Sequence, residues 1–149
     1  MATLRPIVVG TDGSERAERA VDRAGELAKS LGVKVHVVSS YSEGSGGQST
    51  PAARGVAPPP TSEQRDERTH AQHYVDRAQQ LLAVAGVESE THVWPGAPAE
   101  ALVRIADEQD AQMIIVGNRG MTGARRVLGS VPNRVSHHAR CDVLIVATA

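Results

Sequence analysis

The sequence is short of aromatic residues and of cysteine, and each shortage excludes a class of protein. It holds no phenylalanine, one tryptophan and two tyrosines among 149 residues, so it lacks the aromatic platforms on which single-stranded nucleic acids stack. The lone cysteine, Cys141, excludes an internal disulfide and is typical of a reducing compartment. A formal net charge of −1 argues against wholesale electrostatic binding to nucleic acid or to a membrane surface.

Long apolar runs are also missing. No window approaches the length that spans a bilayer, and residues 1–6 carry no apolar signal region. We therefore expect a cytoplasmic protein of one domain, residues 1–149, with no membrane and no nucleic-acid partner. Its core must be built from valine, isoleucine, leucine and alanine.

What the chain does have is a regular alternation of short apolar runs and amphipathic stretches. The runs predict strands at 6–10, 33–38, 91–94, 113–116 and 143–146. Helices are predicted to follow Ser14 as an N-cap, to run from near Ser62 to Ala85, to begin at Pro98 and to span 131–139. This order predicts an α/β fold, a doubly wound five-stranded parallel sheet with helices on both faces. The Gly-, Ser- and Pro-rich segment 42–61 is predicted to be a flexible loop.

The segment 117–130 is the strongest functional signal. Its glycines stand between a predicted strand and a helix, where main-chain N–H groups and a helix N-terminus can hold an anion. From Gly117 to Cys141 there are five arginines, Arg119 among them, and no acidic residue. We interpret the segment as a phosphate-binding loop. It is neither a Walker A loop, because the lysine is missing, nor a dinucleotide fingerprint, because Gly-x-Gly-x-x-Gly does not follow the first strand.

These residues resemble the universal stress protein family. The nucleotide signature of that family is Gly-x2-Gly-x9-Gly-Ser/Thr, and Gly117, Gly120, Gly129 and Ser130 follow its order, with eight residues in place of nine between Gly120 and Gly129. Segments 8–14, 96–98 and 142–146 also look like the family. The resemblance implies a Rossmann-like sheet of order 3-2-1-4-5.

The resemblance also implies a ligand, an adenine nucleotide at the carboxyl ends of the strands. Thr11 and Asp12 would meet the base or ribose, and Ser40 would border the base. Phosphate would lie against the segment that holds Gly117, Arg119, Gly120, Gly129, Ser130 and Val131. The first hypothesis is an ATP-binding sensor or regulator, with Mg²⁺ as an optional companion of the ATP, and the second is a cyclic AMP-binding member. Asp12 has a structural alternative, because it could simply cap the first helix or serve a tight turn.

Two readings from other classes stay open: a slow ATPase that holds Mg²⁺ through Asp12, and a ligand-free interaction module. No catalytic set stands out, so we do not expect an enzyme. No metal site is expected either, because His137 and His138 are adjacent and no third ligand appears beside His70 and His73. The last predicted strand, 143–146, would lie at a sheet edge, and uncovered edges favour pairing. We expect a homodimer through that edge, as the family resemblance also implies.

Overall fold

The computed structural model describes residues 4–42, 59–118 and 130–148, and of Ser130 it describes the backbone alone. The expected loop 42–61 therefore lies mostly outside the described residues. Five parallel strands form one sheet in the order β3-β2-β1-β4-β5, which confirms the predicted fold. The strands are β1 (Ile7–Gly10), β2 (Val35–Tyr41), β3 (Ser89–Pro95), β4 (Met113–Gly117) and β5 (Asp142–Val146).

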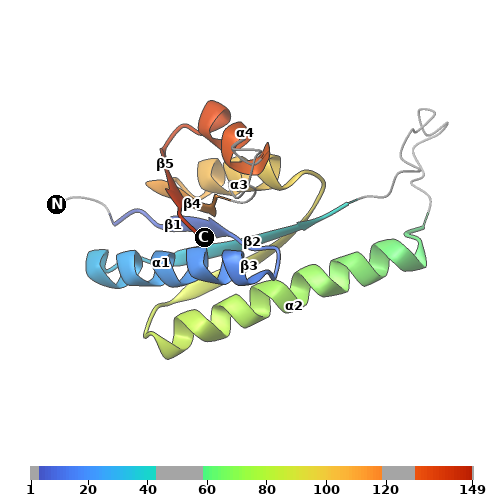
Figure 1. Ribbon diagram of the computed structural model, residues 1–149, viewed down its shortest axis with the longest axis horizontal. Coiled ribbons are helices and arrows are strands. Elements are labelled where there is room, and N and C mark those ends of the chain that lie inside the picture. The colour runs from blue at the N-terminus through green and yellow to red at the C-terminus, as the bar shows by residue number, and fades with distance from the viewer. Residues whose placement is uncertain (1–3, 43–58, 119–129, 149) are drawn as a thin grey trace.

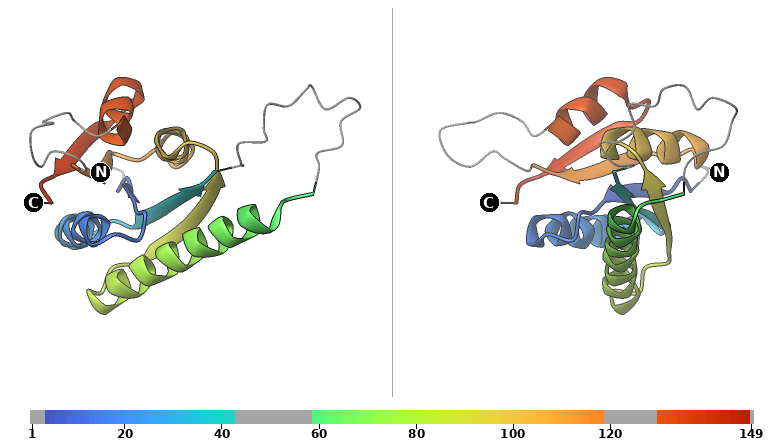
Figure 2. Two further views of the ribbon diagram at one scale, coloured as in Figure 1. Left: turned by 45° about the vertical axis from the view of Figure 1, so that its right-hand side comes forward. Right: turned by 90° about the vertical axis from the view of Figure 1, so that its right-hand side faces the viewer.

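Helices cover both faces of the sheet (Figures 1 and 2). They are α1 (Glu15–Leu31), α2 (Ser62–Val84), α3 (Pro98–Glu108) and α4 (Ser130–His138). Alternate residues of a strand face opposite sides, so the sheet contributes to two cores. Ile7, Val9 and Val37 pack with α1 and α2, whereas Val8 and Val38 pack with α3 and α4.

Local sequence explains where the helices begin and end. Ser14 caps α1, its side chain accepting a hydrogen bond from the Ala17 amide, and Gly32 ends the helix with a positive φ of 68°. Thr61 and Gln64 form a capping box at the start of α2. Pro98 opens α3, where its missing N–H costs no helical hydrogen bond.

The second strand differs from the prediction. It starts at Val35 and reaches Tyr41, two residues later at its start and three later at its end than predicted. Val33 instead belongs to the turn that closes α1, because its amide donates to the Ala28 carbonyl at 3.0 Å. At the other end Ser39, Ser40 and Tyr41 pair with β3. Pairing with β3 therefore keeps the polar end of β2 in the extended conformation of a strand.

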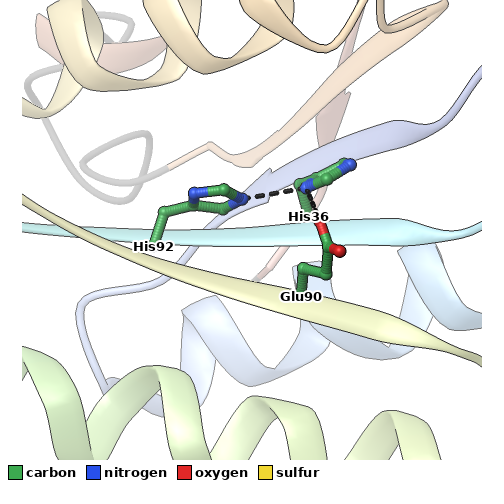
Figure 3. Close-up of side chains that lie close together, drawn as sticks. All are labelled: His36, Glu90 and His92. Carbon is green, nitrogen blue, oxygen red and sulfur yellow. Dashed lines mark hydrogen bonds and ion pairs between the residues drawn. The ribbon is translucent and has the colours of Figure 1, made fainter.

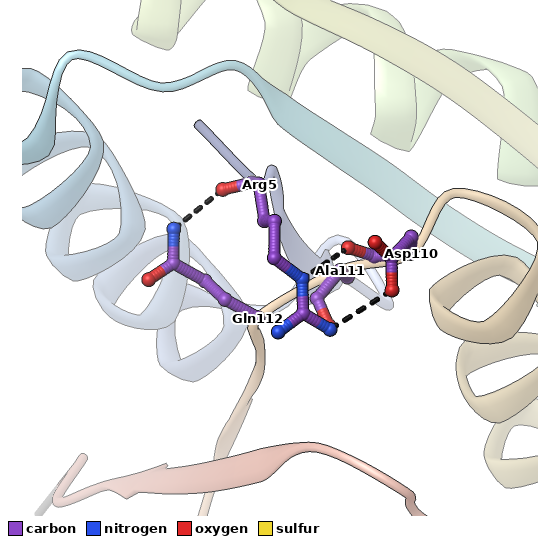
Figure 4. A network of polar contacts seen from close by, with 4 residues as sticks. All are labelled: Arg5, Asp110, Ala111 and Gln112. Atoms are coloured by element: carbon purple, nitrogen blue, oxygen red, sulfur yellow. Dashed lines mark hydrogen bonds and ion pairs between the residues drawn. The ribbon is translucent and has the colours of Figure 1, made fainter. Parts of the chain in front are cut away.

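The amino ends of the central strands are fastened together by Arg5 (Figure 4). Its Nη2 donates to the Asp110 side chain at 2.9 Å and to the Ala111 carbonyl at 3.2 Å. Gln112 returns a side-chain hydrogen bond to the Arg5 carbonyl and a backbone one to Pro6 at 2.9 Å. These contacts close the α3–β4 turn onto the start of β1.

Candidate functional site

A cavity of about 670 Å³ opens at the carboxyl edge of the sheet. Its size is that of a small-molecule site, and its position is where ligands bind in doubly wound sheets, beside the strands at which the winding reverses. Its walls come from the ends of β1, β2 and β4, the starts of α1, α3 and α4, and the amino-terminal half of α2. Sequence segments far apart in the chain therefore meet around one space.

The β1–α1 turn forms the floor of this cavity and is organised by its own side chains. Thr11 Oγ1 accepts from the Gly13 amide at 3.2 Å, and Asp12 Oδ1 accepts from the Ser14 amide at 3.0 Å. Thr11 is buried and its own amide donates to the Val38 carbonyl at 2.9 Å. Asp12 thus has the turn-forming role that the sequence left open, and it also lines the cavity. The two roles are compatible because a carboxylate accepts several hydrogen bonds.

Gly13 lets α2 come close to this turn. Its φ is +79°, and a Cβ built on it would lie 2.3 Å from Cδ1 of Tyr74. No side chain fits at that distance, so the tyrosine ring rests directly on the glycine backbone. The close approach places Tyr74 on the wall of the cavity.

The structure brings together five of the residues that the sequence selected. Thr11, Asp12, Ser40, Gly117 and Val131 all line the cavity. Ser130 is the first residue of α4 and directly precedes Val131. Arg119, Gly120 and Gly129 lie outside the described residues. The neighbour of Ser40, Ser39, is 3% exposed and is absent from the cavity wall.

The carboxyl end of β4 is tied to the end of the chain. Asn118 Oδ1 accepts from the Thr148 amide at 2.9 Å and from its hydroxyl at 2.7 Å. A Cβ on Gly117 would lie 3.2 Å from the Thr148 methyl group. The residues that follow β5 therefore buttress Gly117, the point at which the chain enters the glycine-rich segment.

The sequence did not reveal the wall that α2 contributes. Glu67, His70 and Tyr74 line the cavity together with Tyr41 of β2. Glu67 accepts from the amide and the hydroxyl of Ser42 at 3.1 and 2.6 Å, and the rings of His70 and Tyr74 are nearly parallel with centroids 6.4 Å apart. The apolar period of α2 marks its inner face, but nothing in it says where along the helix the sheet ends. Only packing supplies that information.

The charges and dipoles of the cavity differ from one side to the other. The N-termini of α1, α3 and α4 open on it, and each carries partial positive charge. Arg16 on α1 adds a full positive charge, whereas Asp12 in the turn before α1 and Glu67 on α2 each add a negative one. The arrangement suits a ligand with an anionic group near α4 and an uncharged ring near α2. None of the described helices is long and apolar enough to cross a membrane.

Comparison with known proteins gives consistent matches over the whole chain. The sequence model of the universal stress protein family matches residues 3–147. A universal stress protein of Mycobacterium tuberculosis is 37% identical over 150 residues, covering 99% of both chains. One from Bacillus subtilis is 31% identical over 145 residues, covering 94% of this chain and 97% of its own.

Solved structures are similar in fold as well as in sequence. A universal stress protein in complex with cyclic AMP superposes with a TM-score of 0.74 at 33% identity, covering 99% of this chain and all of its own. The universal stress protein of Archaeoglobus fulgidus in complex with dAMP gives a TM-score of 0.71 at 31% identity, covering 95% of this chain and 96% of its own.

Proposed function

Because the chain belongs to the universal stress protein family, we propose that its cavity binds an adenine nucleotide and that the protein acts as a nucleotide-responsive sensor or regulator. The observation that carries the proposal is the meeting of Thr11, Asp12, Ser40, Gly117 and Val131 around one space of about 670 Å³. Two structural relatives at 33% and 31% identity hold cyclic AMP and dAMP, ligands that share an adenine base and a single phosphate.

The physical asymmetry of the cavity gives the ligand a direction. Phosphate is favoured near the start of α4, beside Gly117, because the dipole and the first main-chain N–H groups of that helix attract negative charge. The base is favoured near α2, where the nearly parallel rings of His70 and Tyr74 offer flat surfaces and where the carboxylate of Glu67 would repel a phosphate. Thr11, Asp12 and Ser40 then lie between the two ends, where they can contact ribose or base.

ATP is the first candidate and cyclic AMP the second, and they place different demands on the site. ATP needs donors for three phosphates, with Mg²⁺ neutralising part of their charge, whereas cyclic AMP needs donors for one. Three or four charge-assisted hydrogen bonds at roughly 1.5–3 kcal/mol each, with a buried base, leave a net of about 8 kcal/mol, which corresponds to a Kd near micromolar. Competition titration calorimetry of ATP against cyclic AMP ranks the two.

The test of the proposal is a pair of variants that make the same substitution in different places. Val131→Glu puts a carboxylate on the cavity wall where phosphate is expected. Val84→Glu makes the same change at a side chain that is 91% exposed at the end of α2. We expect the first variant to lose adenine-nucleotide affinity by at least tenfold and the second to keep it. Circular dichroism and thermal melts check that both variants are folded.

Two results would count against the proposal. Wild-type protein that gives no calorimetric signal with millimolar ATP, cyclic AMP or dAMP would reject the ligand class. Equal affinity in Val131→Glu and wild type would place the ligand elsewhere. Mass spectrometry of small molecules that co-purify with the protein identifies the natural nucleotide directly.

The assembly that we propose is a homodimer through β5. In the described part of the chain β5 is an edge strand, and Val143, Leu144, Ile145 and Val146 are half-buried rather than buried. Apolar side chains and unpaired main-chain groups on an edge favour pairing with a second strand. Sedimentation velocity at micromolar concentration should give a dimer, and a monomer would refute this assembly.

A further inference from the structure

Two histidines that are far apart in the sequence meet on the sheet face that α3 and α4 cover. The parallel pairing of β2 with β3 aligns His36 with Glu90 and Val38 with His92. Because alternate residues share a face, His36, Glu90 and His92 all point to the side on which Val38 packs with α3. Figure 3 shows the three side chains converging beside β2 and β3.

The converging atoms are metal-ligand atoms at metal-ligand spacing. His36 Nδ1 lies 2.9 Å from His92 Nε2 and 3.4 Å from Glu90 Oε2, and one ligand atom from each residue lies within 4.8 Å of the other two. Ligand atoms about 2.0–2.1 Å from a tetrahedral zinc ion are about 3.3 Å apart. The two distances from His36 Nδ1 bracket that value.

His36 Nδ1 faces two possible partners at once, His92 Nε2 and Glu90 Oε2. A neutral imidazole nitrogen either carries one hydrogen or presents one lone pair, in the plane of the ring. If His36 Nδ1 carries the hydrogen, it has both His92 Nε2 and Glu90 Oε2 as acceptors. If His92 Nε2 carries it, then the lone pair of His36 Nδ1 also faces the carboxylate oxygen. A cation between the three atoms would use all three lone pairs at once.

Burial acts in the same direction on the pKa of both imidazoles, and lowers it. Burial lowers the pKa of His36, with the positive charges of His92 and Lys34 acting in the same direction and Glu90 opposing them. Burial also lowers the pKa of His92, against the opposing carboxylates of Glu90 and Glu108. Lys34 contacts Oε1 of Glu90 at 3.2 Å, which leaves Oε2 for a metal.

We propose that His36, Glu90 and His92 bind a divalent transition-metal ion of the zinc class, with water as the fourth ligand. Two imidazoles and one carboxylate suit zinc, whereas magnesium and calcium prefer oxygen ligands alone. His36 is 1% exposed and fixes one side of the site. Glu90, whose side chain is 52% exposed, gives the ion a path from solvent. None of the three residues lines the nucleotide cavity, so the site is separate from it.

The consequence for the molecule is a cross-link between β2 and the edge strand β3. An ion that binds the folded chain and not the unfolded one raises the free energy of unfolding by RT ln(1 + L/Kd), where L is the free ion concentration, and the melting temperature rises with it. The site thus makes the stability of this sheet edge depend on free metal.

The experiment uses untagged protein that has been treated with a chelator and then dialysed. Zn²⁺ is titrated into it against a chromophoric chelator, and Co²⁺ is used in parallel because its visible absorption reports coordination geometry. The variants are His92→Gln and Glu90→Gln. The matched control is His73→Gln, which changes an exposed histidine of α2 outside the cluster.

Wild type and His73→Gln should each bind one Zn²⁺ per chain and show a tetrahedral Co²⁺ spectrum and a Zn²⁺-dependent rise in melting temperature. His92→Gln and Glu90→Gln should each lose at least tenfold in affinity and lose the rise. Adenine-nucleotide affinity should be the same in all four proteins, so this outcome is independent of the nucleotide proposal. Glu90→Gln alters an exposed side chain and keeps the test valid if His92→Gln does not fold.

The proposal is overturned if wild type binds no Zn²⁺ stoichiometrically, or if His92→Gln and Glu90→Gln bind it as wild type does. It is also overturned if the affinity disappears in His73→Gln, because the ion would then belong to the surface histidines of α2.

Discussion

Replacing Gly13 by alanine tests how closely α2 is held against the floor of the cavity. The substitution has two costs that can be separated. The first is backbone strain, because alanine at a φ of +79° costs roughly 1–2 kcal/mol. The second is overpacking, because the new Cβ would lie 2.3 Å from the Tyr74 ring, and such insertions typically cost about 1–3 kcal/mol. We therefore expect Gly13→Ala to lower the free energy of unfolding by about 2–5 kcal/mol.

Gly86 provides a matched control for the backbone term. Its φ is +80°, but a Cβ there meets nothing within 4 Å. Gly86→Ala should therefore cost only the strain, about 1–2 kcal/mol. In a domain of this size each kcal/mol lowers the melting temperature by roughly 2–4 °C. In urea denaturation the free energy of unfolding of Gly13→Ala should therefore be lower than that of Gly86→Ala by the overpacking cost, and thermal melts should show the same order.

A double-mutant cycle assigns that difference to the tyrosine. In a Tyr74→Ala background the clash is gone, so Gly13→Ala should cost no more than Gly86→Ala does. The double variant should then be less destabilised than the sum of the two single variants, by about 1–3 kcal/mol. Equal costs for Gly13→Ala and Gly86→Ala in the wild-type background would refute the close contact. So would a cost of Gly13→Ala that Tyr74→Ala leaves unchanged.

Three further predictions concern local contacts. Ser14→Ala removes the cap of the Ala17 amide and should cost about 1 kcal/mol in urea denaturation, with Ser14→Thr as a control that keeps most of it. Leu102→Ala truncates a side chain that is 2% exposed and should lower the free energy of unfolding by about 2–5 kcal/mol. A loss below 1 kcal/mol would contradict the place of Leu102 in the core. The folded-state pKa values of His36 and His92 lie below their unfolded value of 6.5, so the stability that they contribute is present above pH 6.5 and is lost as the pH falls toward the folded values. Metal-free wild type should thus lose more melting temperature than His92→Gln between pH 7 and pH 5, and equal losses would contradict the shifts.

Much of the architecture could be predicted because it depends on short-range patterns. Apolar runs of four to six residues, separated by amphipathic stretches, define buried parallel strands and their crossover helices. The strand order does not follow from such patterns; the family resemblance implied it, and the structure confirms it. Strand ends were less predictable, as β2 illustrates: Ser39, Ser40 and Tyr41 have a polar, coil-like composition, and pairing with β3 holds them in the sheet. A hydrogen-bonded neighbour is not visible in local composition.

Some residues of the candidate site were expected from the sequence, and others were found only in the structure. Thr11, Asp12, Gly117 and Val131 follow strand ends or begin helices, and in a parallel sheet all such junctions meet at one edge. The family resemblance selected these residues, and the strand and helix pattern agrees with it. The α2 wall and the approach of Tyr74 to Gly13 were not predictable, because they depend on how far a helix extends along the sheet.

The sequence by itself determined the alternation of strands and helices and the junctions that carry the candidate ligand residues, because these depend on hydrophobic period and on glycine and capping residues close together in the chain. Only the tertiary structure decided which distant side chains meet. His36 and His92 are separated by 56 positions, and nothing near either one indicates the other. The strand register brought them together, because a shift of one residue would have turned one histidine to the opposite face of the sheet.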